Sequence, residues 1–166
     1  MNSSSHPFDD AHAVKCELAS EVLRSSGTLR LQVTGWSMLP AVWPGDLLVI
    51  QRATSSEVSE GDIVLFGRDG RLFAHRVLAK NLEDSAMLTR GDAMAALDPV
   101  VRENELLGRV SSIARNGRCI APSRALRFSE RVVASLVRSS TIAARVVVGV
   151  RGMHQAAQRQ IVQVQN

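Results

Sequence analysis

The sequence predicts a mainly β domain with a short helix before it and a basic helix after it. Three observations support this fold class. Short apolar runs, some alternating with polar residues, recur through the middle of the chain. Asp-Gly and Asn-Gly pairs separate some of these runs, as they do in β-hairpins. Towards both ends, apolar residues instead recur at helical spacing. We therefore divide the chain into an N-terminal segment (1–28), a β domain (29–121) and a helical tail (122–166).

The elements follow from these patterns in chain order. Residues 1–10 are expected to be a loose polar start, and an amphipathic helix is expected from Ala11 to Arg24, where Ser-Ser-Gly ends it. Turns are expected at Asp69-Gly70 and Asn116-Gly117. The apolar runs predict strands over 29–34, 47–50, 63–66, 72–78, 86–89, 106–113 and 119–120.

The tail is expected to form a valine-rich helix over 126–151. Arg131, Arg138 and Arg145 recur every seven residues and so share one face. Apolar surface beside such a stripe is typical of a helix lying on a membrane surface. The same pattern fits a helix that packs on the β domain or on a second copy of the chain. Both interpretations stay open at this point.

Charge and composition restrict the function classes. Of the 166 residues, 45% are apolar and 22% charged, which excludes wholesale disorder. Residues 1–113 carry 11 Lys/Arg against 15 Asp/Glu, whereas residues 114–166 carry nine Arg against one acid. The basic tail suggests an anionic partner, but no nucleic-acid-binding motif accompanies it, so we expect no nucleic acid. Cys16 and Cys119 lie too far apart to suggest a metal site or a disulfide framework.

No membrane-spanning run or signal peptide is evident. The start of the chain has no basic region followed by an apolar one, and the most apolar tail stretch contains two arginines. A cytoplasmic location and a peripheral membrane location both remain open, as does the oligomeric state.

Three segments carry residues suited to chemistry. The first contains Ser37 in Gly-Trp-Ser-Met-Leu-Pro, a loop that follows a strand. The second places His75 within an apolar strand, in Ala-His-Arg-Val. The third, Arg-Gly-Asp-Ala-Met-Ala-Ala-Leu-Asp-Pro, holds Asp92 and Asp98 six residues apart. A histidine can activate a serine hydroxyl, and either aspartate can fix the histidine tautomer. Taken singly, each is more often a turn or a structural residue.

Together, in this order, the segments resemble the signal peptidase I superfamily. The similarity runs from Ser-Met-Leu-Pro through Gly-Asp-Ile-Val, His-Arg-Val and Gly-Asp-x5-Asp to a closing Gly-Arg-Val, over roughly residues 29–113. Its usual bacterial members place a lysine before Arg-Val. His75 at that position is similar to the endoplasmic-reticulum, archaeal and sporulation-type branch, which uses serine, histidine and aspartate.

The resemblance implies a complex β fold like that of signal peptidases and LexA, a groove for an extended peptide, and a preference for small residues before the cut. It implies Ser37 as nucleophile, His75 as general base, and Asp98 or Asp92 as the acid, with Asp98 favoured. Gly35, Met38 and Pro40 match positions at the oxyanion and substrate site. Some relatives carry a hydroxyl at the position of Gly35, so a backbone donor must serve here. No cofactor or metal is implied.

The expected function is therefore a serine endopeptidase that cleaves precursor proteins or peptides. Two alternatives remain. One is a self-cleaving regulator like LexA, although those relatives use serine with lysine and carry a DNA-binding head. The other is a peptide- or membrane-binding module that keeps the fold without the activity.

Overall fold

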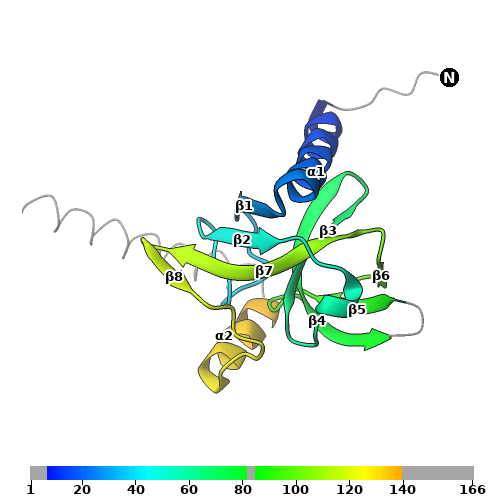
Figure 1. Cartoon of the computed structure of the whole chain (residues 1–166). Helices are drawn as coiled ribbons and strands as arrows, with labels where there is room; N and C mark the ends of the chain where they lie inside the picture. Colours follow the sequence, from blue (N-terminus) through cyan, green and yellow to red (C-terminus); the bar gives the residue numbers. More distant parts are fainter. Residues whose placement is uncertain (1–6, 82–84, 140–166) are drawn as a thin grey trace, which may run out of the picture.

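The computed structural model describes residues 7–81 and 85–139. Within these residues, eight strands form one sheet with antiparallel pairing, preceded by helix α1 (Pro7–Ser26) and followed by helix α2 (Phe128–Ser139) (Figure 1). The mainly β fold class is confirmed. The strands are β1 (Thr28–Gln32), β2 (Leu47–Gln51), β3 (Ile63–Arg68), β4 (Arg71–Asn81), β5 (Ala86–Arg90), β6 (Val101–Arg102), β7 (Leu106–Arg115) and β8 (Arg118–Ile120).

Strand β3 is the centre of the core. The sheet order is β1-β2-β7-β3-β4-β5-β6, and β8 pairs with β7 beside this path. Ile63 and Leu65 point into one apolar cluster, whereas Val64 and Phe66 point into a second cluster. Because successive side chains of a strand face opposite sides, both faces of β3 are covered. This explains why its sequence is continuously apolar rather than alternating.

The two predicted hairpin turns are present. Asp69 and Gly70 link β3 to β4 with φ values of 50° and 70°. Asn116 and Gly117 link β7 to β8 with φ values of 51° and 74°. Positive φ at both central residues is the requirement of a tight type I′ turn, which Asp-Gly and Asn-Gly meet at low cost.

Helix α1 begins four residues before its predicted start, so the expectation of a loose segment is wrong for residues 7–10. Pro7 suits the first helical position, where no backbone N–H is needed. The helix ends at Gly27, which has a φ of 71° and donates its N–H to the Leu23 carbonyl at 3.0 Å.

Two short elements are not apparent from the sequence. Strand β6 pairs with the start of β5, and its two residues are too few to show an alternating pattern. A 3₁₀ turn, η1 (Ser55–Glu57), follows Thr54, whose backbone N–H donates to the Glu57 carboxylate at 2.8 Å. The Thr-x-x-Glu spacing of a capping box is the sequence signal that could have indicated this turn, although the apolar pattern does not.

Helix α2 packs on the β domain through one face. Val133 and Val137 contact Leu39 and Ala93, which come from two separate loops of the domain. Arg131 is exposed and donates through Nε to the Leu126 carbonyl at 3.1 Å. The rest of the predicted tail helix, with Arg145, lies outside the described residues, and the membrane interpretation stays a prediction. Neither helix of the described part combines the length and the apolar character needed to cross a bilayer.

Candidate active site

Ser37 lies in the loop between β1 and β2, and hydrogen bonds hold the two ends of that loop together. Val33 and Asp46 close it, because the Val33 N–H donates to the Asp46 carbonyl at 2.9 Å. The Asp46 side chain is 4% exposed and accepts from the Trp43 N–H and from the Arg115 guanidinium. These bonds hold the serine on a rigid support even though it belongs to no strand.

His75 lies between Ser37 and Asp98. Its Nε2 is 3.0 Å from Ser37 Oγ, and its Nδ1 is 2.7 Å from Asp98 Oδ2. An ionised carboxylate only accepts hydrogen bonds, so Nδ1 carries the ring proton and Nε2 presents its lone pair to the serine hydroxyl. This tautomer is the one that can accept a proton from Ser37.

Asp98 is held in its ionised form by its surroundings. Burial alone would raise the pKa of Asp98, but hydrogen bonds from His75 and Thr89, with the nearby charge of Arg68, lower that pKa below its ordinary value. Thr89 Oγ1 donates to Asp98 Oδ2 at 2.7 Å, and the Asp98 N–H donates to the Thr89 carbonyl at 3.0 Å. Arg68 donates to the carbonyls of Pro99 and Val100, which fixes the chain just after the aspartate.

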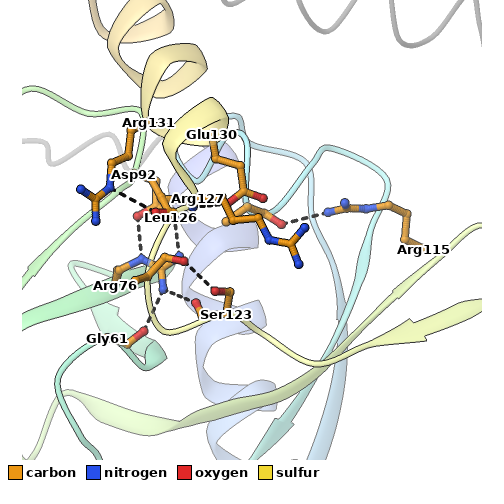
Figure 2. Close-up of polar contacts among 11 residues, drawn as sticks. Gly61, Arg76, Asp92, Arg115, Ser123, Leu126, Arg127, Glu130 and Arg131 are labelled. Carbon is orange, nitrogen blue, oxygen red and sulfur yellow. Dashed lines mark hydrogen bonds and ion pairs between the residues drawn. The ribbon is translucent and has the colours of Figure 1, made fainter.

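Asp92 has a different partner. Its carboxylate accepts two hydrogen bonds from Arg76, at 2.8 and 2.7 Å, and both side chains are buried. Arg76 also donates to the Gly61 and Ser123 carbonyls, so it joins three separate segments (Figure 2). His75 and Arg76 are neighbours on β4 and face opposite sides of the strand. One face of β4 thus carries His75, and the other face carries Arg76, which holds the loop that contains Asp92.

The loop at 91–94 also holds the backbone of Ser37. The Ala93 N–H donates to the Ser37 carbonyl at 2.8 Å. A Cβ placed on Gly91 would lie 2.6 Å from that carbonyl oxygen, closer than any side chain can sit. Gly91 is therefore needed for the close approach of the two loops.

A groove of about 610 Å³ leads to Ser37 and His75. Residues 32–35, which continue β1, line one side, and residues 71–75 of β4 line the other. Among the described strands, β1 pairs only with β2, and β5 pairs with β4 only from Arg76 onward. Both sides of the groove therefore present a strand edge that no other described strand covers, and an extended peptide can pair with such an edge.

The other sequence-predicted residues fall in different places. Gly35 lines the groove, and a Cβ there would meet nothing within 4 Å. Met38 is 3% exposed and lines the groove floor. Pro40 is buried, follows a cis peptide bond, and does not line the groove.

Sequence reasoning missed Thr89 and Arg68, which position Asp98. Thr89 is buried on the same face of β5 as Met87, and nothing in the sequence distinguishes it from an ordinary polar strand residue. Arg68 precedes the Asp-Gly turn and reads as a solvent-facing charge. Within residues 7–81 and 85–139, no three His, Cys, Asp or Glu side chains gather as metal ligands would.

The fold and the site together define the class of protein. A mainly antiparallel β domain that holds serine, histidine and aspartate in hydrogen-bonding order beside a groove has the fold of a serine peptidase. The chain belongs to the Peptidase S24-like family, whose model matches residues 4–111, about two thirds of the sequence. This family lies in the clan of signal peptidase I and LexA-like serine peptidases, so the resemblance drawn from the sequence is confirmed. No curated protein matches the chain.

Proposed function

We propose that the chain is a serine endopeptidase of signal-peptidase type, with Ser37 as nucleophile, His75 as general base and Asp98 as the residue that orients the base. The observation that carries this proposal is the line of hydrogen bonds from Ser37 Oγ through His75 to Asp98, with distances of 3.0 and 2.7 Å, beside the groove. These are hydrogen-bonding distances suited to proton transfer between nucleophile and base.

The reaction is acyl transfer to Ser37. His75 Nε2 accepts the hydroxyl proton as Oγ attacks the peptide carbonyl, and Asp98 stabilises the imidazolium that forms. The same proton passes to the leaving amine, and the acyl group stays on Ser37. A water molecule then gives a proton to His75 and attacks the ester. His75 returns that proton to Ser37 Oγ as the new carboxyl terminus leaves. The Ser37 backbone N–H is the donor that we expect for the oxyanion, since Gly35 offers no side-chain donor.

The substrate that fits the groove is an extended peptide. Two facing strand edges supply backbone hydrogen bonds, and the floor between them is apolar, with Met38, Leu65 and Leu72 among its residues. We propose that the peptide carries small residues before the scissile bond, in an Ala-x-Ala arrangement.

The test is cleavage of an Ala-x-Ala peptide by the full chain, with and without anionic vesicles. We expect cleavage by the wild type and its loss, by at least about a thousandfold, in Ser37→Ala and His75→Ala. Ser129→Ala, which changes an exposed serine on α2, is the matched control and retains the wild-type rate. Equal cleavage by Ser37→Ala and the wild type would overturn the proposal.

A second candidate is a self-cleaving regulator, which the family match favours. Against it stands the histidine at position 75, where we expect lysine in such relatives. The order of the reaction separates the two candidates. Self-cleavage within one chain proceeds at a rate constant independent of protein concentration, whereas a peptidase that acts on other chains cleaves added peptide in proportion to its own concentration.

A further inference from the structure

One end of the groove is lined by basic side chains. His12 and Lys15 of α1 and Arg71 of β4 line it at this end, and the described residues that line the groove include no Asp or Glu. Asp69, in the turn beside β4, does not line the groove. His12 and Lys15 are exposed, so a substrate in the groove can reach them.

Helix α1 is fixed in this position by close packing. Its Ala13 lies against the β3–β4 turn, so that a Cβ added to Gly70 would lie 3.3 Å from the Ala13 Cα. Cys16, one turn further along, packs more closely still on Gly67 of β3, where an added Cβ would lie 2.6 Å from the Cys16 Sγ. Figure 1 shows the helix beside the tip of the β3–β4 hairpin. The helix therefore presents Lys15 to the groove from a fixed place.

We propose that this end of the groove is a subsite for an acidic side chain of the substrate. Arg71 and His75 lie on the same face of β4, four residues apart. A strand rises about 3.3 Å per residue, so Arg71 at the basic end lies roughly 13 Å along β4 from His75. An extended peptide spans that distance with four residues. The substrate would thus combine small residues at the scissile bond with Asp or Glu about four residues away.

This inference rests on the proposed function, because it takes the groove to be a peptide site. Its physical basis is charge complementarity, which selects among peptides that satisfy the same backbone bonds. The attraction is screened by salt, so the selectivity should fall as ionic strength rises.

The test measures binding without turnover. Fluorescent Ala-x-Ala peptides carry Glu, Gln or Lys four residues before the small residues, and a second set carries them four residues after. Their affinities for Ser37→Ala protein are measured by fluorescence anisotropy. In one of the two sets we expect Glu to bind about fivefold more tightly than Gln, the upper range for one exposed ion pair, and Lys more weakly.

Charge reversal makes the test specific to Lys15. Combined with Ser37→Ala, Lys15→Glu should abolish the preference for Glu, because the new carboxylate offsets the remaining positive charge at this end. Arg118→Glu reverses a charge on β8, away from the groove lining, and should leave the preference for Glu unchanged.

Several outcomes would overturn the subsite. They are equal affinities of the three peptides in both sets, absence of binding by any peptide, and a Glu preference that survives Lys15→Glu. Cleavage separates the two proposals. A Glu preference in binding without cleavage by the active protein would overturn the peptidase and leave the subsite standing. Cleavage of the peptides with no difference in their affinities would overturn the subsite and leave the peptidase standing.

Discussion

The two aspartates of the Gly-Asp-x5-Asp segment have different partners in the fold. Asp98 accepts from His75 and Thr89, whereas Asp92 accepts from the buried Arg76. Asp98 therefore fixes which nitrogen of His75 carries the proton, and Asp92 stabilises the loop at 91–94. Substitutions at the two positions should have different consequences.

Asp98→Asn should lower the free energy of unfolding near neutral pH by about 1 kcal/mol, since hydrogen bonds to a charged group become neutral ones. The pKa of Asp98 is lowered in the folded protein. Its contribution is therefore present above the ordinary unfolded-state pKa and is lost as pH falls through the folded-state pKa, below 3.8. Urea denaturation of both proteins across pH 2–7 checks this. Asp69→Asn, in an exposed turn, serves as control, and a difference that widens at low pH would contradict the expectation.

Gly35→Ser should raise the rate of peptide cleavage. Position 35 matches a hydroxyl donor in some relatives, and a Cβ there meets nothing within 4 Å, so the side chain fits. One oxyanion donor is typically worth about 10²–10³ in rate, and an imperfectly placed new donor should give roughly tenfold. The change should appear in kcat rather than KM. Gly35→Ala is the control, and an equal effect of both substitutions would exclude a hydrogen-bonding role.

At the scale of elements, buried aspartate–arginine pairs fix the loops of the site. Three Gly-Asp pairs occur in the described residues at turns or loops, and each aspartate is buried with an arginine partner. Asp46 pairs with Arg115, Asp62 with Arg109 and Arg124, and Asp92 with Arg76. The first and third hold the loops that meet at Ser37.

Asp92→Ala should destabilise the fold strongly, because it leaves Arg76 buried without its carboxylate. The expected loss is about 3–5 kcal/mol, as for one partner removed from a buried ion pair. Chemical denaturation measures the loss directly. Asp69→Asn, which removes an exposed carboxylate and keeps a residue suited to the turn, should cost far less. Equal costs at the two positions would show that the Arg76 pair does not support the fold.

Helix α2 packs against the two loops that contain Ser37 and Asp92. Val137 is 2% exposed and contacts Leu39 and Ala93, whereas Val132 on the same helix is 46% exposed. Val137→Ala should cost about 2 kcal/mol from lost burial and the cavity left behind. Val132→Ala should cost less than about 0.5 kcal/mol. Thermal unfolding of both variants tests this, and similar losses would argue against packing of α2 on the site.

The sequence indicated most of the elements, and physical reasons explain the differences. Alternation and Asp-Gly or Asn-Gly pairs are local signals, so the hairpins at 63–78 and 106–120 could be predicted. The start of α1 depends on the suitability of Pro7 for the first helical position, which the spacing of apolar residues does not indicate. Strand β6 exists only because β5 offers it a partner, and no local pattern reveals such a strand.

The composition of the site was predictable, and its pairing was predictable only as a preference for Asp98 that came from the family resemblance. Ser37, His75 and the two aspartates could be selected from their residue types and order. Which aspartate meets His75 depends on the path of the loop between them and on Arg76, which lies on the opposite face of β4. Thr89 and Arg68 contribute only through tertiary contacts, so the sequence could not single them out.

At the scale of the whole molecule, the sheet brings together segments that are distant in the chain. The loop after β1, the middle of β4 and the loop after β5 supply Ser37, His75 and Asp98. Helix α1 closes one end of the groove with basic side chains, and α2 packs behind the serine loop. The arginines of the tail and their proposed membrane contact remain a prediction from the sequence.

The measurement that tests the central claim most directly is labelling of the full chain with a fluorophosphonate probe, followed by mass spectrometry of the modified peptide. The account predicts one adduct, on Ser37, that is absent from Ser37→Ala and at least about a hundredfold slower to form in His75→Ala. An unlabelled wild type that is folded, at saturating probe, would contradict a serine peptidase and would favour a binding module that keeps the fold.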